Sequence, residues 1–388
     1  MMKRQIYLDN AATTPLLPEV MDEITRCLAE DFGNPSSLHR LGLQSERRIK
    51  DSRNSIARLM NVPTEDVIFT SGGTESNNLA ILGATRARNR YGKHCITTQI
   101  EHSSILNTFG YLEGEGWDIS YLPVDNHGIL DLDKLKDAIK PDTVLVSIGY
   151  VNSEIGSIQP IREIGMFLKS NHPDIIFHSD AVQAFGRLNL KPLDWGLDLM
   201  SASGHKVHGP KGVGILYIRK GTPLATLQWG GGQEMGIRSG TENLSGIAGF
   251  GKAAELLHQF MDRDDNTIAG MKKALAEGIA KAVPEAVLNG PMPDRGAPHI
   301  LNISIPGIRG ETLLHVLESH GVYVSTGSAC SSRRTKISHV LYAIGVTGPV
   351  AEGAIRLSLS YMSDPDELSS VPDILRESVD QVKKFTRR

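Results

Sequence analysis

Short apolar runs alternate with amphipathic segments along most of the chain, and this alternation constrains the fold more than any other feature. Six runs have the composition of buried strands, at 66–70, 94–99, 142–148, 174–180, 197–203 and 213–218. Segments with helical periodicity lie between them, for example 75–92 and 160–171. Strand–helix alternation is typical of α/β proteins. It predicts a mostly parallel central sheet wrapped by helices.

The pattern changes beyond residue 260. A long helical stretch covers about 243–283, and shorter elements follow: strands at 299–307, 322–326 and 354–360, with helices at 310–319, near 337–344 and from 364. This order is typical of a smaller α+β unit. Since 388 residues suit two domains, we predict a large domain over 15–260 and a small one from 1–14 with 261–388.

Composition excludes several classes of function. A net charge of −3 with 22% charged residues gives no basic surface for nucleic acid. No apolar run reaches the roughly 18 residues of a membrane span, and the first residues lack the apolar core of a signal peptide. The three cysteines, Cys27, Cys95 and Cys330, are odd in number and far apart, which favours a reducing compartment. We therefore expect a cytoplasmic protein.

Ligands of open α/β sheets bind at the carboxyl ends of the strands, so the polar residues there are the candidates for a site. After the run 66–70, the segment "TSGGTESNN" opens a helix. Gly73 lets backbone amides approach an anion, and Thr74 offers a hydroxyl at a helix amino end. The alternative is an ordinary capped turn. A nucleotide P-loop is excluded because no Gly-Lys-Ser/Thr follows.

Three further strand ends carry candidates. His102 follows 94–99, and a single histidine there is often structural. Asp180 ends 174–180 with Gln183 one turn later; the carboxylate either caps a helix or holds a cation or a protonated ring nitrogen.

Lys206 follows 197–203 among small residues, beside Ser203 and His205. A desolvated lysine can lose its charge and form a Schiff base. The alternative is an exposed loop lysine that is a solvated charge without a catalytic role. An anion cradle, a carboxylate, a residue beside a flat ring and a Schiff-base lysine together match the needs of pyridoxal phosphate.

The chain is similar to the cysteine desulfurases, a branch of the fold type I pyridoxal-phosphate enzymes with NifS- and IscS-like members. The resemblance is nearly end to end. It is carried by "YLDNAATTP" (7–15), "FGNPSSLHRLG" (32–42), "FTSGGTESNNLAI" (69–81), "EHSSIL" (101–106), "SGHKVHGPKGVG" (203–214), "GGGQEMGIRSGTEN" (230–243), "STGSACSS" (325–332) and "AIRLSLS" (354–360).

This resemblance implies a role for each candidate. Lys206 would hold the cofactor covalently and then carry protons, with His102 stacked on the ring. Asp180 would pair with the ring nitrogen and Gln183 with the ring oxygen. The phosphate would be held by Gly73, Thr74, Ser203 and His205.

The resemblance also implies two contacts beyond the ring. Thr241 would reach the phosphate of a neighbouring subunit, which implies a homodimer. Arg356 would bind the substrate carboxylate with two parallel hydrogen bonds from its guanidinium.

Cys330 lies in "STGSACSSRRTK", which is almost without apolar residues and predicts an exposed loop of the small domain. Nearby cations favour a thiolate. The resemblance implies that Cys330 attacks the sulfur of L-cysteine, giving L-alanine and a persulfide. An acceptor protein in iron–sulfur cluster assembly, or in tRNA or cofactor thiolation, would then take the sulfur.

The chain departs from the family pattern at "VNSEIG", where Ser153 replaces a usual asparagine next to Asn152. The asparagine is expected to contact the cofactor or the substrate carboxylate, so either Ser153 weakens substrate binding or Asn152 compensates. The chain also stops at "VKKFTRR", soon after the last helical pattern, so docking to an acceptor is expected to differ from that of the branch with a longer tail.

Three alternatives stay open. One is another enzyme of the same fold, a selenocysteine lyase or an aminotransferase; an aminotransferase would not need Cys330. A sulfur carrier without catalysis is the second. The third is a metal hydrolase, which leaves Lys206 unexplained and would use His102, His178, Asp180, His205 and His208. We expect no metal.

Overall fold

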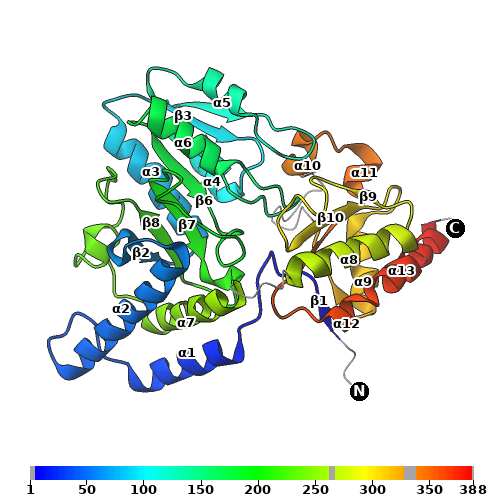
Figure 1. The fold of residues 1–388 in the computed structure, drawn as a ribbon, viewed down its shortest axis with the longest axis horizontal. Coiled ribbons are helices and arrows are strands. Elements are labelled where there is room, and N and C mark those ends of the chain that lie inside the picture. Colours follow the sequence, from blue (N-terminus) through cyan, green and yellow to red (C-terminus); the bar gives the residue numbers. More distant parts are fainter. Residues whose placement is uncertain (1–4, 262–266, 327–337, 387–388) are drawn as a thin grey trace.

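A seven-stranded sheet forms the centre of the larger part of the molecule (Figure 1). The computed structural model describes residues 5–261, 267–326 and 338–386. The strand order is β2-β8-β7-β6-β5-β3-β4, and β8 is antiparallel to both of its neighbours while the other pairs are parallel. The strands are β2 (Val67–Thr70), β3 (His94–Thr98), β4 (Asp118–Leu122), β5 (Thr143–Ser147), β6 (Ile176–Asp180), β7 (Leu199–Ser203) and β8 (Gly214–Ile218).

The central strands are buried on both faces, which explains their continuous apolar sequences. Alternate residues face opposite layers of helices. Phe177 and Met200 pack into a cluster with α2 (Arg40–Met60), α6 (Ile161–Asn171) and α7 (Leu244–Met261). Ile176 and Leu199 pack on the other side with α3 (Gly73–Arg88) and α4 (Ser103–Gly114). All six strands that the sequence predicts for this central sheet are present.

Strand β4 is absent from the sequence-based prediction. It lies at the sheet edge beside β3, and only Leu122 of its five residues is buried. An edge strand carries no continuous apolar run, because one side of its ladder and part of its surface meet solvent. Its sequence, DISYL, therefore lacks the signal by which the other strands are found.

A second, smaller set of elements packs beside the sheet (Figure 1). Strands β9 (Val287–Leu288), β10 (Ile300–Ser304) and β12 (Ala354–Ser358) form an antiparallel sheet, and β1 (Ile6–Tyr7) pairs in parallel with β11 (Val322–Tyr323). Their core is shared with α8 (Thr267–Ala282), α9 (Gly310–Ser319) and α13 (Val371–Thr386). Its buried members include Ile6 and Leu8 from the start of the chain.

The helical stretch expected over 243–283 appears as two helices, α7 and α8, on either side of residues 262–266, which lie outside the described ranges. Phe250 and Leu257 of α7 belong to the core of the larger sheet, whereas Leu275 and Ile279 of α8 belong to the smaller core. The remaining helical elements are short or peripheral: α1 (Pro18–Glu30), η1 (Thr64–Asp66), α5 (Leu132–Ala138), η2 (Gly204–Lys206), η3 (Glu234–Gly236), α10 (His339–Ala343), α11 (Gly348–Glu352) and α12 (Pro365–Leu368).

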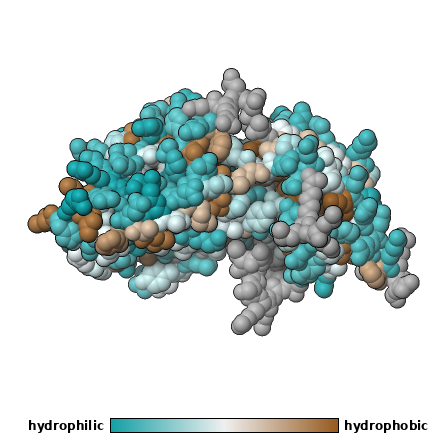
Figure 2. All heavy atoms as spheres, turned by 90° about the horizontal axis from the view of Figure 1, so that it is seen from below, coloured by the Kyte–Doolittle hydropathy of each residue, from teal (hydrophilic) through white to brown (hydrophobic). Residues whose placement is uncertain are grey.

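The surface is mainly hydrophilic, with apolar groups at the left end of Figure 2, where Figure 1 places α1 and α2. Large apolar side chains between and beside these helices are strongly exposed: Leu28 is 66%, Phe32 74% and Leu38 104% exposed. Within the described ranges, no helix combines the length and the apolar character that crossing a membrane requires.

Candidate active site

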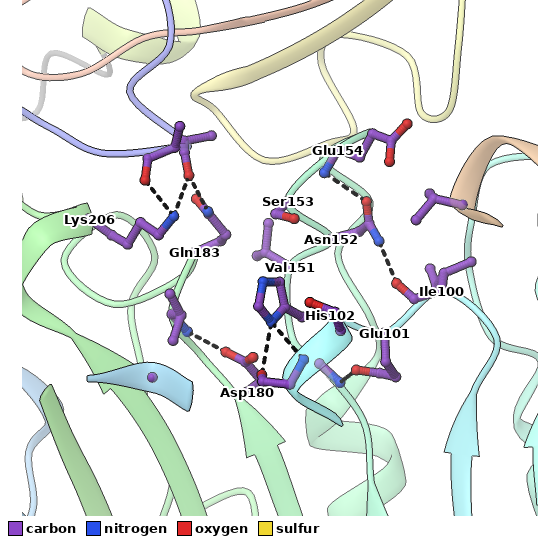
Figure 3. Close-up of a pocket in the computed structure, with 18 of the residues that line it drawn as sticks. Ile100, Glu101, His102, Val151, Asn152, Ser153, Glu154, Asp180, Gln183 and Lys206 are labelled. Atoms are coloured by element: carbon purple, nitrogen blue, oxygen red, sulfur yellow. Dashed lines mark hydrogen bonds between the residues drawn. The ribbon is translucent and has the colours of Figure 1, made fainter. Parts of the chain in front are cut away.

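A pocket of about 640 Å³ opens at the carboxyl ends of the central strands, against the smaller set of elements. Its floor comes from the ends of β3, β5, β6 and β7, and its far wall from β12 and the start of α10. The pocket brings together nearly all of the site residues expected from the sequence: Gly73, Thr74, His102, Asn152, Ser153, Asp180, Gln183, Ser203, His205, Lys206 and Arg356. Figure 3 shows the inner part of this arrangement.

Lys206 ends the short helix η2 directly after β7, so its side chain enters the pocket from the sheet edge. Its Nζ donates to the carbonyl oxygens of Ala11, at 2.8 Å, and Ala12, at 2.7 Å (Figure 3). Both acceptors belong to the segment that follows β1. Two backbone oxygens therefore hold the amine at a point where small residues leave room for a ligand.

An anion cradle lies at the amino end of α3. Gly72 has φ 153° and ψ −178°, a conformation that is essentially confined to glycine. A Cβ on Gly73 would lie 2.7 Å from Cγ2 of Val182, so a larger residue would close the cradle. The Ser203 hydroxyl is buried here, and no described residue forms a hydrogen bond with it. Helix-end amides, Thr74 and an unsatisfied hydroxyl are donors suited to a phosphate group.

Asp180 is fixed at the end of β6 by two donors. Its Oδ1 accepts from the amide of Val182 at 2.9 Å, and its Oδ2 accepts from Nδ2 of Asn77 at 2.8 Å. The same Asn77 amide donates to Oγ of Ser104, also at 2.8 Å. Donors on both oxygens hold the carboxyl group in one orientation at the end of the strand.

His102 caps the start of α4 through its ring. Nδ1 accepts from the Ser104 amide at 3.2 Å and lies 2.8 Å from the Ser104 hydroxyl. Burial lowers the pKa of His102 below its usual range, although the Asp180 carboxylate opposes the shift. The ring is therefore neutral at pH 7, with its hydrogen on Nε2. Burial also lowers the pKa of His205, to about 4, so this second imidazole is neutral as well.

Gln183 is held at both ends of its amide. Nε2 donates to the Ala11 carbonyl at 2.9 Å, and Oε1 lies 3.2 Å from both Nη1 of Arg187 and Nε2 of His299. One amide hydrogen is left for a ligand in the pocket.

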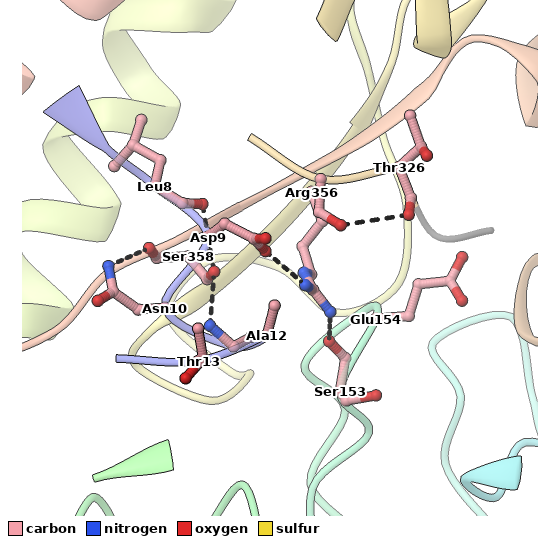
Figure 4. A network of polar contacts seen from close by, with 12 residues as sticks. Leu8, Asp9, Asn10, Ala12, Thr13, Ser153, Glu154, Thr326, Arg356 and Ser358 are labelled. Carbon is pink, nitrogen blue, oxygen red and sulfur yellow. Dashed lines mark hydrogen bonds and ion pairs between the residues drawn. The ribbon is translucent and has the colours of Figure 1, made fainter. Parts of the chain in front are cut away.

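Arg356 lies in the middle of β12 and is only 8% exposed. Its guanidinium is fixed by Asp9 Oδ1, at 2.7 Å from Nη2, and by the Ser153 carbonyl, at 2.7 Å from Nη1 (Figure 4). The buried Nε has no hydrogen-bond partner among the described residues. A planar cation held in one orientation, with donors to spare, is suited to a carboxylate.

The side chain of Asn152 is committed to the backbone. Its Nδ2 donates to the Ile100 carbonyl at 2.8 Å, and its Oδ1 accepts from the amides of Glu154, at 2.9 Å, and Ile155, at 3.0 Å. These bonds shape the turn after β5. One hydrogen of the Asn152 amide has no bond among these contacts, and Asn152 lines the pocket. Ser153 holds Arg356 through its carbonyl rather than its hydroxyl.

Two candidates lie elsewhere. Thr241 is exposed and lines a separate small pocket behind η3. Cys330 lies outside the described residues, but the pocket is lined by Thr326 and Ser338 on either side of that segment. Ser338 donates to Oε2 of the buried Glu154 at 2.7 Å.

The other two cysteines are buried. Burial raises the pKa of Cys27 to about 11 and also raises that of Cys95, so neither is a thiolate at neutral pH.

Several residues of the site were not assigned from the sequence. Asn77 orients Asp180, Asp9 orients Arg356, and the buried Glu101 accepts from Thr98 Oγ1 at 2.6 Å and the Gly149 amide at 2.9 Å. Burial raises the pKa of Glu101 to about 7. Asn77 and Asp9 stand inside the motifs at 70–78 and 7–15, but their partners are distant in sequence, so the motifs alone do not reveal these contacts.

The same side chains do not form a metal site. Among the described residues, no group of three or more His, Cys, Asp or Glu side chains is arranged to hold a metal ion. Of the histidines that a metal hydrolase would use, His178 bonds to Ser147 and Ser201, and His208 to the Pro15 carbonyl.

The sheet and pocket define a fold type I pyridoxal-phosphate enzyme, as the sequence predicts. Residues 6–371 match the family model for aminotransferase class-V. A NifS-like protein of known structure superimposes with a TM-score of 0.91 at 35% identity, covering 97% of this chain and 100% of the other. A structure of SspA in complex with cysteine superimposes with a TM-score of 0.80 at 34% identity, covering 91% of this chain and 98% of the other.

A cysteine desulfurase IscS of Dictyoglomus turgidum is 44% identical over 385 residues, which cover 99% of this chain and 97% of the relative. Another, of Methanosarcina thermophila, is 43% identical over 383 residues, covering 99% of this chain and 94% of the relative. The chain therefore belongs to the aminotransferase class-V family and, within it, to the cysteine desulfurases. Its cofactor is pyridoxal phosphate, and the cradle, carboxylate and lysine described above fit that group.

Proposed function

We propose that this enzyme removes the sulfur of L-cysteine, giving L-alanine and a persulfide on Cys330. The observation that carries the proposal is the single pocket that joins Lys206, Asp180 and an anion cradle to a fixed arginine, with the chain on both sides of Cys330 at its rim. Pyridoxal phosphate, when bound, supplies an electron sink that weakens the bonds at the α-carbon of the substrate.

The cofactor would be held by residues at the strand ends. Lys206 is the covalent attachment point, and Asp180 keeps the ring nitrogen protonated. The amides at Gly73, with Thr74, Ser203 and His205, bind the phosphate. Two residues would contact the ring itself: His102 would lie beside it, and Gln183 would donate to its oxygen.

Lys206 and Cys330 would perform the sulfur transfer. The Lys206 amine takes the α-proton and returns a proton to the three-carbon fragment, and the neutral His102 lines the same pocket. The Cys330 thiolate attacks the substrate sulfur, so that the carbon–sulfur bond breaks as a sulfur–sulfur bond forms. Oxidation of the sulfur is matched by reduction of the substrate β-carbon, and no external oxidant is needed.

Arg356 would bind the substrate carboxylate. We expect Arg356→Lys to raise KM for cysteine about tenfold with a smaller change in kcat. An ammonium group cannot donate to both oxygens of the substrate carboxylate while it stays bonded to Asp9 and Ser153. Steady-state kinetics of alanine release measure this. An unchanged KM would show that the carboxylate binds elsewhere.

Ser153 would leave the substrate carboxylate one donor short. Since a serine side chain is shorter than asparagine and lacks its amide donor, we expect Ser153→Asn to lower KM about fivefold, the effect of one added hydrogen bond. The bond from Arg356 to the residue 153 carbonyl does not involve the side chain and stays in place. Ser153→Ala is the control and should leave KM near the wild-type value. Equal KM values for Ser153→Asn and wild type would contradict a carboxylate contact at this position.

A homodimer would complete the site. Thr241 is exposed and remote from the pocket of its own chain, as expected for a residue that reaches the phosphate of a neighbouring subunit. The loop that carries it is fixed by an ion pair between Arg238 and Glu75, at 2.7 Å. The exposed apolar side chains near α1 and α2 are typical of a protein interface.

We further propose a division into a cofactor-binding domain, 15–260, and a small domain, 1–14 with 261–388, that carries Cys330. The separate apolar core of Ile6, Leu8 and residues beyond 267 supports this division. The enzyme would act in the cytoplasm, as its cysteine usage suggests. It would pass the persulfide sulfur to an acceptor protein in iron–sulfur cluster assembly, or in tRNA or cofactor thiolation.

Cysteine labelled at sulfur tests the proposal directly. After incubation with purified enzyme under non-reducing conditions, mass spectrometry is expected to find one labelled sulfur on the peptide that contains Cys330, with alanine as the co-product. Label released only as free sulfide, with no modified Cys330 peptide, would refute the persulfide. Selenocysteine in place of cysteine tests the lyase alternative: turnover restricted to the selenium compound would favour it.

A further inference from the structure

Arg187 is a buried cation that none of the roles above explains. It is 8% exposed, and its hydrogen-bond partners are two carbonyl oxygens: Oε1 of Gln183, at 3.2 Å from Nη1, and the backbone oxygen of Lys206, at 2.6 Å from Nη2. Among the described residues, no carboxylate pairs with it. Burial lowers the pKa of Arg187 to about 10, so the guanidinium stays charged at neutral pH. A buried charge without a counter-ion is costly.

The contacts of Arg187 determine how the Gln183 amide is oriented. A guanidinium has only donors, so the Gln183 atom that faces it must be the carbonyl oxygen. At the other end of the amide, the Ala11 carbonyl has only lone pairs, so the atom 2.9 Å away must be the nitrogen. Both ends give the same orientation. The second N–H of Gln183 is therefore the group that the amide presents to the pocket.

His299 adds a second donor to the same oxygen. Its ring is fully buried, and Nε2 lies 3.2 Å from Gln183 Oε1. Since that oxygen only accepts, Nε2 carries the hydrogen. Nδ1 is buried and has no hydrogen-bond partner in the part of the chain that the structure describes. Burial lowers the pKa of His299 well below its usual value, and the charges of Arg187, Lys272 and Arg356 act in the same direction. The ring is thus a neutral donor.

We propose that Arg187 is a positioning residue, which, together with His299, fixes and polarises the Gln183 amide so that its N–H faces the oxygen of the cofactor ring. This inference rests on the proposed contact between Gln183 and that oxygen. A cation on the carbonyl side of an amide strengthens its N–H as a donor. A donor aimed at the ring oxygen withdraws negative charge from the chromophore and so lowers its proton affinity.

The pH midpoint of the visible absorbance change of the bound cofactor tests this proposal. We expect Arg187→Met to raise the midpoint by about one pH unit, a tenfold change in proton affinity. Arg187→Lys, which keeps a cationic donor, should restore most of the shift. Arg48→Met is the matched control, because it breaks ion pairs with Glu23 and Asp31 remote from the pocket. It should lower thermal stability without moving the midpoint.

A double-mutant cycle separates an effect through Gln183 from a direct effect of charge. Gln183→Leu alone should raise the midpoint, and Arg187→Met should add nothing in that background. An equal shift in both backgrounds, or a wild-type midpoint for Arg187→Met, would overturn the positioning role. No shift in Gln183→Leu would refute the ring-oxygen contact itself.

His299→Leu gives the same test if Arg187→Met does not fold. This variant removes the second donor while leaving the cation in place, and it should raise the midpoint in wild type but not in Gln183→Leu. A wild-type midpoint for His299→Leu would then count against the proposal.

Discussion

Lys206→Ala is expected to lose the visible absorbance of the enzyme and to lower alanine production from cysteine about 10⁴-fold or more. The amine is both the covalent attachment point of the cofactor and the proton carrier, and no other lysine of the described residues lines the pocket. Loss of a residue with both roles removes covalent and general acid–base catalysis together. Absorbance of the purified protein and a single-turnover assay of alanine measure the two effects separately.

Lys211→Ala is the matched control. Lys211 lies in the same loop but is exposed and does not line the pocket. This variant should keep the absorbance and the rate within about twofold, as expected for a surface substitution. A Lys206→Ala protein that stays yellow after dialysis and still turns over cysteine would contradict the assignment of the lysine and, with it, the proposed chemistry.

Cys330→Ala is expected to separate the two halves of the reaction. The absorbance should stay, because the cofactor contacts lie on other elements, whereas alanine production should fall by about 10³-fold or more because the sulfur acceptor is gone. Cysteine should still change the spectrum on mixing, since substrate binding does not need the thiol. Stopped-flow absorbance and alanine assays on the same preparation test both expectations.

Cys27→Ala and Cys95→Ala serve as controls for this experiment. Both thiols are buried, with a raised pKa and no place in the pocket, so their replacement should affect stability rather than turnover. Full desulfurase activity in Cys330→Ala would mean that the substrate sulfur leaves by another route, such as direct release as sulfide. It would remove the persulfide from the proposal while leaving the role of Lys206 intact.

Sequence patterns locate most of the sheet and the strand-end residues because burial on both faces leaves a continuous apolar run that stops at a polar residue. Asp180 is found in this way at the end of one such run, and Lys206 is found shortly after another. Strand β4 is not predicted from the sequence, because it lies at the edge of the sheet and only one of its residues is buried. Contacts that join distant segments also escape, as in the pair of Asp9 and Arg356, since no local pattern encodes them.

The turn after β5 shows a different reason for failure. The spelling "VNSEIG" does not reveal whether Asn152 faces the pocket or its own backbone, because asparagine is equally suited to ligand contacts and to turns. In the structure, the Asn152 oxygen and one amide hydrogen bond to the backbone of the turn, while the residue also lines the pocket. Likewise, the role of Gln183 depends on the orientation of its amide, which is fixed by Arg187 and His299. Arg187 follows Gln183 by four residues, whereas His299 is distant in sequence and directly precedes β10.

The segment that follows β1 connects the two ends of the chain at the site. Ala11 and Ala12 accept from Lys206, Asp9 bonds to Arg356, and the Ala11 amide donates to Ser358 Oγ at 2.9 Å. During synthesis, the ribosome therefore releases the large sheet long before the strand that bears residue 356 exists. The substrate end of the pocket is completed only after the strand that bears residue 356 has emerged, later than the strand ends that carry Asp180 and Lys206.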